Sequence, residues 1–453
     1  MLKPAFLLSL VFAVASTSTS TAKDYPLEIK TIKAEQVMAF PGGYGAHGML
    51  SLRKPAGLKR EPRAVSRHAI YGQFGENGPN AMVFRLDESK GDGQGYDRLI
   101  VDLNRNGDLT DDAVTIPAAE PATAARVRTS TSEQKLFGPV TLSADKTTGG
   151  TRPIYYAQMY LYNRQLLTAA ARSAVQTYFG TLIFKAGWYL EATVDLKGVP
   201  QKIGVYDGDA NLQLGNPWKS RPQGSGPAQQ FYFPVGDSFL CDVDRSGKFE
   251  NNQFNTETSP FGPALYADDT PLQVVISPDR KSVQITPWPT PLATLAVQPQ
   301  GYPVRDISLA WEQSPGQWQL LKARVINGKT SVPPGNYWLY STVMAAGAGN
   351  GDMVMLSGLN HSAKNAFRAS AGQVTTVRCG APLELKLAAE KDKYASANGY
   401  TVRVQAQVLG QGGETFSSFA KGRNFTAPAP ASPVFKVLAQ DGRQLDSGKM
   451  EFG

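Results

Sequence analysis

Three short segments of the chain place oxygen-bearing side chains at the same spacing. In each segment Asp, Asn or Ser occupies positions 1, 3 and 5, an apolar residue occupies position 8, and Asp or Asn occupies position 10. Ca²⁺ takes about six to eight oxygen ligands, and alternate residues of a tight loop can direct side-chain oxygens toward one ion. The spacing therefore predicts three calcium-binding loops. Loop 1 (102–112) contains Asp102, Asn104, Asn106, Asp108, Asp111 and Asp112, loop 2 (207–216) contains Asp207, Asp209, Asn211 and Asn216, and loop 3 (242–252) contains Asp242, Asp244, Ser246 and Asn251.

Loop 1, and more loosely loop 3, resemble the calcium loops of EF-hand and dockerin domains. Glycine at position 6 permits the sharp turn of such loops, and Gly107 and Gly247 stand there. Loop 2 is degenerate because Leu212 replaces this glycine. The resemblance implies a bidentate glutamate at position 12, where these loops instead have Ala113, Trp218 and Gln253. We therefore expect a shorter loop geometry than in an EF-hand, with loop 1 as the strongest site and loop 2 as the weakest.

The same residues also have an interpretation that needs no metal. Asp, Asn and Gly form ordinary turns, since their side chains hydrogen-bond their own backbone. Each loop follows a short apolar run typical of a strand, at 99–101, 203–205 and 239–241, whereas an EF-hand requires a long helix there. We expect calcium loops that follow strands of a β scaffold. On that hypothesis, Asp102→Ala should lower thermal stability in calcium but not in chelator.

Loop 2 also resembles the aspartic-protease pattern, in which an apolar strand pair leads to an Asp-Thr-Gly triplet. Here the triplet is Asp207-Gly208-Asp209, without the hydroxyl residue. A true Asp-Ser-Gly occurs at Asp446-Ser447-Gly448, but too near the end of the chain for the strand that should follow. Because two carboxylates must meet to share a proton in such an enzyme, the sequence disfavours a protease.

The N-terminal residues have the three parts of a secretory signal peptide. Lys3 precedes a largely apolar run from Ala5 to Ala15, and a Ser/Thr-rich stretch ends at Ala22. We predict a signal peptide over residues 1–22 and a secreted or periplasmic protein. No later apolar run reaches the ~18 residues of a transmembrane helix, so we expect no transmembrane anchor.

Composition and patterning predict an all-β fold with several β-sandwich or β-barrel-like domains and at most one or two short helices. The 453 residues include 44 Gly and 31 Pro, and polar and apolar residues alternate over segments such as 189–196 and 401–408. The Ala-rich segment 165–177 is the candidate helix. Length and proline-rich breaks predict four domains after the signal peptide, at 23–150, 151–292, 293–387 and 388–453.

The third predicted domain carries a second resemblance. Pro334-Gly335-Asn336-Tyr337 and the run to Tyr340 are similar to a strand of transthyretin-like and carboxypeptidase-regulatory-like sandwiches. The similarity covers under a fifth of the chain and implies a β-sandwich rather than an activity. The layout as a whole resembles that of large uncharacterised secreted bacterial proteins.

A dense basic run lies between residues 53 and 67. It contains six cations, Arg53, Lys54, Lys59, Arg60, Arg63 and Arg67, with Glu61 as the opposing charge. Such a run could dock an acidic polysaccharide or an anionic membrane, or it is a solvated loop. No nucleic-acid-reading motif accompanies it, so we expect no nucleic-acid partner.

The sequence names no catalytic residue. The histidines His47, His68 and His361 show no zinc-site spacing, and no G-x-S-x-G elbow is present. The two cysteines, Cys241 and Cys379, either pair or remain buried thiols. We predict a secreted calcium-binding β protein with structural calcium and a binding or scaffold role. The alternatives are an extracellular polysaccharide-binding module and a secreted polysaccharide-degrading enzyme, the partner being a polysaccharide or another extracellular polymer.

Overall fold

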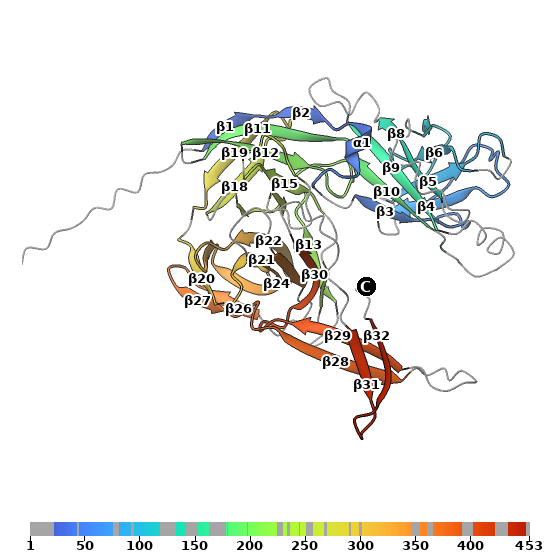
Figure 1. Ribbon diagram of the computed structural model, residues 1–453. Coiled ribbons are helices and arrows are strands. Elements are labelled where there is room, and N and C mark those ends of the chain that lie inside the picture. Colours follow the sequence, from blue (N-terminus) through green and yellow to red (C-terminus); the bar gives the residue numbers. More distant parts are fainter. Residues whose placement is uncertain are drawn as a thin grey trace, which may run out of the picture.

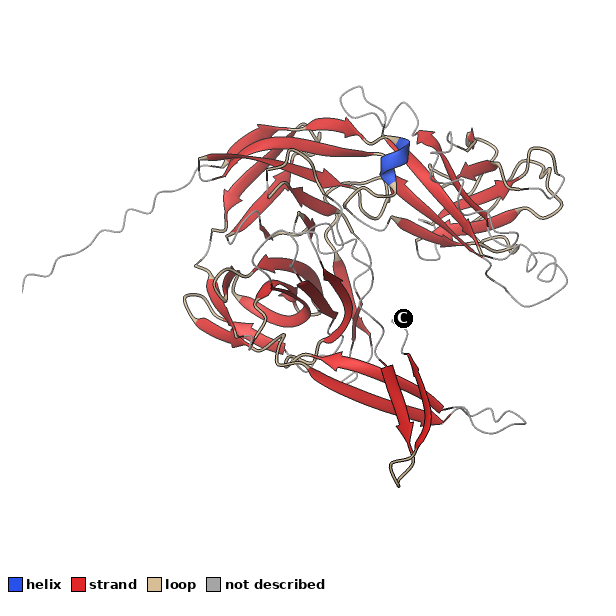
Figure 2. Cartoon of the chain, in the orientation of Figure 1, coloured by secondary structure: helices blue, strands red, loops and turns tan. Residues whose placement is uncertain are grey.

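The computed structural model describes residues 22–449 with several gaps. The described part omits 43–44, 76–80, 92–94, 118–132, 142–152, 163–177, 179, 197, 224–229, 233–235, 244, 251–256, 267–269, 290, 299–300, 347–353, 360–365, 392–401 and 422–433. Nearly all of its regular structure is strand (Figure 2), and its one helix is the four-residue α1 (Ala34–Val37). The all-β prediction is confirmed. The predicted helix at 165–177 lies outside the described residues, as do residues 1–21 of the predicted signal peptide.

The strands between residues 23 and 287, apart from β13 and β14, build four antiparallel sheets. One has the order β1-β19-β18-β17, with bounds Lys23–Pro26, Ser282–Pro287, Pro271–Ile276 and Leu265–Tyr266. A second has the order β3-β10-β9-β8, with bounds Ala46–Met49, Gly180–Ala186, Ile154–Leu161 and Glu133–Thr141. A third has the order β16-β15-β12-β11-β2, with bounds Thr258–Pro260, Ser238–Cys241, Val199–Tyr206, Trp188–Leu196 and Glu28–Thr31. The fourth has the order β4-β5-β6-β7, with bounds Ile70–Phe74, Met82–Asp87, Arg98–Val101 and Val114–Thr115.

The second half is dominated by a ten-stranded sheet. Its order is β14-β13-β22-β21-β24-β25-β30-β29-β28, with β26 also paired to β24. The bounds are Gln230–Tyr232, Lys219–Gln223, Gln317–Arg324, Val304–Ser314, Gly335–Ala346, Val354–Leu359, Thr415–Lys421, Val402–Leu409, Glu384–Lys391 and, for β26, Ala366–Ala369. A small sheet β23-β20-β27 (Lys329–Val332, Ala293–Val297, Val374–Val377) and the hairpin β31-β32 (Val434–Leu438, Gln444–Lys449) complete it. Figure 1 shows the hairpin β28–β29 extending away from this half.

Alternation along the strands explains how the sheets bury their faces. In β11, Trp188, Leu190, Ala192 and Val194 are buried while the residues between them are at least partly exposed, which is the period-two pattern of a strand with one covered face. Such faces pack into one core that runs from Tyr25 to Ile285. A second core runs from Ala264 to Phe416 and includes the stacked rings of Trp311 and Tyr337.

The predicted domain boundaries at 150, 292 and 387 fall at different kinds of place in this architecture. The first core extends across residue 150, where β8 and β9 pair as neighbouring strands on either side of the boundary. The boundary at 387 falls inside β28, which belongs to the ten-stranded sheet. The boundary at 292 lies close to the change from the first core to the second, and just before β20.

Three residues singled out by the sequence lie deep in these cores. Cys241 and Cys379 are free thiols, one in each core, so they do not pair in this structure. Tyr337, in the Pro-Gly-Asn-Tyr segment, is fully buried near the start of β24, and its hydroxyl donates to the carbonyl of Pro333. Among the described residues, no helix is long and apolar enough to span a membrane.

Candidate metal centre

The three predicted loops share the same unusual backbone angles at two of their described positions. Residues at positions 4 and 6 have positive φ in every loop, which only glycine adopts without strain. The values are 60°, 50° and 59° for Arg105, Ala210 and Arg245, and 78°, 72° and 80° for Gly107, Leu212 and Gly247. Loop 2 therefore makes the same turn as the others although it lacks the glycine. The shared spacing in the sequence corresponds to a shared local structure.

The first aspartate of each loop holds that turn together. Its carboxylate accepts backbone N–H groups from positions 5 and 6, as Asp102 does from Asn106 at 3.1 Å and Gly107 at 2.8 Å. Asp207 and Asp242 make the equivalent pairs of bonds in loops 2 and 3. All three carboxylates are buried. These bonds contribute to the turn in addition to any ion that the loop binds.

This finding changes the expected effect of Asp102→Ala. The variant removes an acceptor of two backbone N–H groups. The buried N–H of Gly107 is left unpaired, at a cost of about 1–3 kcal/mol, whereas that of Asn106 keeps Oδ1 of Asn104 at 3.0 Å. We expect a loss of about 2 kcal/mol or more in the free energy of unfolding, both in calcium and in chelator. Urea unfolding in the two buffers measures it. Asp24→Ala is the control, since the exposed Asp24 lies outside the predicted loops and its carboxylate accepts only a side-chain amide, from Gln284, among the described residues. A loss confined to calcium would restore the prediction made from the sequence.

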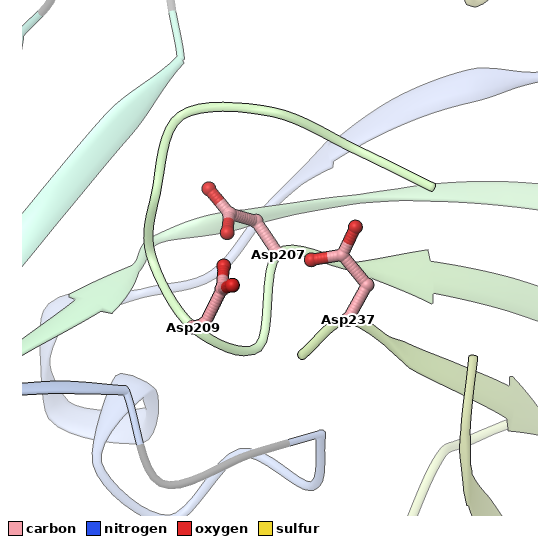
Figure 3. A group of neighbouring side chains, drawn as sticks. All are labelled: Asp207, Asp209 and Asp237. Carbon is pink, nitrogen blue, oxygen red and sulfur yellow. The ribbon is translucent and has the colours of Figure 1, made fainter. Parts of the chain in front are cut away.

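Loop 2 gains a carboxylate that the sequence analysis missed. Strands β12 and β15 are antiparallel, and their register ends at Tyr206 opposite Ser238. The next pair in that register is Asp207 and Asp237. One carboxylate oxygen from each of Asp207, Asp209 and Asp237 lies within 4.8 Å of the other two (Figure 3). Pairing the two apolar runs 203–205 and 239–241 in this register would have found Asp237.

The aspartate group, meaning Asp207, Asp209 and Asp237, is largely withdrawn from solvent. Asp207 and Asp237 are 1% and 0% exposed, and Asp209 is half-buried. Tyr155 donates its hydroxyl to Asp207 at 2.8 Å. The backbone N–H of Asn216 donates to Oδ2 of Asp237 at 2.7 Å, whereas Oδ1 of Asp237 has no hydrogen-bond partner among the described residues. None of the three carboxylates forms an ion pair with a described lysine or arginine. A buried carboxylate oxygen without a donor is the kind of atom that a cation would satisfy.

Glycine at the centre of Asp207-Gly208-Asp209 is required by packing. A Cβ on Gly208 would lie 2.5 Å from the carbonyl oxygen of Gly236 and 2.7 Å from that of Gly42. These contacts are with backbone atoms, which cannot move aside cheaply. The hydroxyl of Ser238 would lie 3.2 Å from the same added Cβ, and it has no hydrogen-bond partner among the described residues. The triplet is thus held tightly between two other segments of the chain.

Burial sets the protonation of the aspartate group. It raises the pKa of Asp207 well above its usual value, and the neighbouring charges of Asp237 and Asp209 raise it further. Burial likewise raises the pKa of Asp237 to about 8 and raises that of Asp209. Three carboxylates this close repel one another in the ionised state. Without a cation, the aspartate group therefore retains protons at neutral pH.

Loop 1 differs because basic residues lie against it. The Lys59 ammonium donates to the carbonyl of Asn106 at 2.7 Å, and Arg60 forms an ion pair with Asp108 at 3.0 Å. Burial, followed by the charges of Asp102 and Asp111, raises the pKa of Asp112 to about 7. The structure thus places the predicted ligands of loop 1 together, but it adds two positive charges that oppose a cation.

Loop 3 is only partly described. Asp242 and Ser246 occupy their predicted positions, with the N–H of Ser246 donating to Asp242 at 2.9 Å. Asp244 and Asn251 lie outside the described residues.

Loops 1 and 2 contact each other, since the Arg105 guanidinium donates to the carbonyl of Asn211 at 2.8 Å. The three loops remain predicted calcium sites.

The fold and this group of side chains define an all-β protein with a buried aspartate centre. No protein-family model, no curated protein and no solved structure matches the chain. The chemistry of the site therefore has to be inferred from its own residues.

Proposed function

We propose that the chain is a calcium-binding β protein in which the aspartate group holds a structural Ca²⁺. The observation that carries the proposal is the convergence of three carboxylates, two of them buried and one of these with an oxygen that has no hydrogen-bond partner among the described residues. A divalent cation would neutralise their repulsion and supply the missing partner. Loop 2 was expected from the sequence to be the weakest of the three calcium sites. The aspartate group nevertheless gives loop 2 the most support for this proposal.

The donor set favours a hard cation. The aspartate group supplies carboxylate oxygens and no His or Cys, which disfavours zinc and copper. Mg²⁺ demands near-ideal octahedral geometry and keeps several waters, whereas Ca²⁺ tolerates irregular sets of about six to eight oxygens. Asn211 lies in the same loop and its side-chain amide donates to Asp209 at 2.9 Å, while its Oδ1 accepts from Gln213 and Asn216. Calcium is the better fit to such a buried and irregular set.

The proposed role of the ion is structural. It would tie the end of β12 to the start of β15 and fix loop 2 against both. Asp207 and Asp237 are too buried to meet a polymer substrate directly. The proposal includes export, since calcium is plentiful outside cells and suits loops of modest affinity. The proposal of export rests on the signal-like sequence at residues 1–22.

Calorimetric titration of chelator-treated protein with Ca²⁺, together with melting curves, tests the proposal. We expect heat of binding and a raised melting temperature, with stabilisation of about 2.7 kcal/mol when calcium is present at about 100 times Kd. Asp237→Asn should abolish both effects because it removes one charge from the buried ligand set. Asp195→Asn is the matched control, since Asp195 is an exposed residue near the end of β11 in the same sheet, and its carboxylate accepts only the N–H of Gly198 among the described residues.

The control separates a specific site from a general loss of charge. Equal calcium responses in the wild type and Asp237→Asn would place the ion elsewhere, with loop 1 as the next candidate. No heat and no shift in the wild type would reduce the loops to ordinary Asx turns.

A further inference from the structure

A cavity of about 790 Å³ lies where the edges of two sheets meet. Strand β3 is the edge of one sheet and β4 is the edge of another. They are joined just beyond β3, where the N–H groups of Ser51 and Tyr71 each donate to the other's carbonyl, at 2.9 and 2.7 Å. The cavity volume falls in the range of about 300–1,000 Å³ that is usual for small-ligand sites.

Glycines bring these two edges close enough to form a continuous floor. A Cβ on Gly72 would lie 2.6 Å from the carbonyl of Met49 and would also overlap the ring of Phe84. A Cβ on Gly48 would lie 2.9 Å from the carbonyl of Gln73. The two backbones therefore pack closely against each other and against the fully buried Phe84.

The charge of the cavity is positive. Arg53 and Lys54, from the start of the basic run, line it, and no Asp or Glu is among the lining residues. Lys54 is held in place by an ion pair with Glu61 and lies 5.7 Å from the ring of Tyr71. The exposed side chain of Arg53 makes no ion pair with a carboxylate of the described residues. Arg53 is therefore available to an anion from solvent.

The tertiary structure divides the basic run into parts with different roles. Lys59 and Arg60 are committed to loop 1 through Asn106 and Asp108. Arg53 and Lys54 face the cavity instead. The run is thus neither a uniform patch nor a wholly solvated loop.

The rim of the cavity combines the charge with exposed apolar surface. Tyr178 and Met49 are 50% and 46% exposed, and His47 and Gln73 add polar groups. A flat ring with a polar end suits stacking against a sugar ring at a partly wet surface. An arginine guanidinium presents a planar fork of donors that matches a carboxylate or a similar oxyanion.

We propose that this cavity binds an anionic oligosaccharide, with Arg53 contacting the acidic group and Tyr178 stacking on a sugar ring. The proposal does not rest on metal binding, because none of its residues belongs to the aspartate group. An acidic sugar accounts for the charge, the exposed ring and the cavity together.

The test is calorimetric titration of the full chain with a tetramer of galacturonic acid, a sulfated heparin tetrasaccharide, and neutral cellotetraose. We expect one acidic sugar to bind and the neutral one not to bind. Arg53→Gln should weaken binding roughly tenfold or more, since it removes a hydrogen bond between charged groups. Arg67→Gln is the matched control, because it makes the same charge change in an exposed part of the basic run away from the cavity. Tyr178→Ala should also weaken binding.

The outcomes separate the possible ligands. Binding of only the uronate or only the sulfated sugar would support the proposal and identify the acidic group. Equal weakening by Arg53→Gln and Arg67→Gln would overturn it in favour of diffuse charge attraction. Equal binding of cellotetraose, efficient displacement by inorganic phosphate, or no binding of either acidic sugar would also overturn it. Unchanged melting temperatures of the variants exclude misfolding as the cause.

Discussion

Arg85→Met is expected to lower the free energy of unfolding by about 3–5 kcal/mol, the cost of breaking a buried ion pair by removing one partner. The Arg85 side chain is 1% exposed on β5. Its guanidinium pairs with Asp87 at 3.1 Å and Glu61 at 3.2 Å, and it donates to the carbonyl of Pro62. Methionine fills a similar space but leaves the carboxylate of Asp87 buried beside it without its cation.

The same network anchors the segment that leads through the basic run. Asp87 also accepts the N–H groups of Val65 at 3.1 Å and Ser66 at 2.7 Å. Through Arg85 and Asp87, residues 61–66 are therefore fixed to β5. Disturbing the pair should loosen this segment as well as the sheet.

Urea unfolding of Arg85→Met beside Arg98→Met measures the effect. Arg98 is half-buried on the adjacent strand β6 and forms no ion pair among the described residues, so its loss should cost less than about 1 kcal/mol. Similar small losses for both variants would show that Arg85 contributes through packing alone.

The second large effect is a loss of stability of the calcium-free protein as pH rises. The pKa of Asp237 is raised to about 8, and that of Asp207 is raised well above its usual value, mainly by burial. The folded state therefore binds more protons than the unfolded state between about pH 4 and pH 8. The stabilisation is fully present below the unfolded-state pKa and is lost as pH rises through the folded-state pKa. Each extra proton held by the folded state contributes about 1.4 kcal/mol per pH unit.

Unfolding in chelator at several pH values between 5 and 8 measures this slope, with about a few kcal/mol expected over the range. Saturating Ca²⁺ should flatten or reverse it, because the ion binds the ionised carboxylates. Asp237→Asn should reduce the slope in chelator, while Asp195→Asn should keep it. Stability in chelator that stays level or rises with pH would contradict a protonated aspartate group.

The sequence by itself determined the features that depend on neighbouring residues. Alternation along segments such as Trp188–Leu196 predicted strands, and the structure confirms the all-β class. The repeated spacing corresponds to a similar pattern of hydrogen bonds in the three loops, because Asp102 and its counterparts bond to backbone groups only four and five residues away. Even the departure at Leu212 did not break the pattern, since the local hydrogen bonds outweigh the cost of its positive φ.

Only the tertiary structure decided which side chains meet across the chain. Asp237 joins Asp207 because β12 and β15 pair in one particular register, and a shift of one residue would turn its side chain to the other face. The approach of Gly42 to Gly208 and the burial of Arg85 against Asp87 also require distant segments to pack. The division of the basic run between loop 1 and the cavity has the same origin. Local sequence sets backbone turns through short-range bonds, whereas burial and close approach follow from which strands pair, and those choices are made by the whole fold.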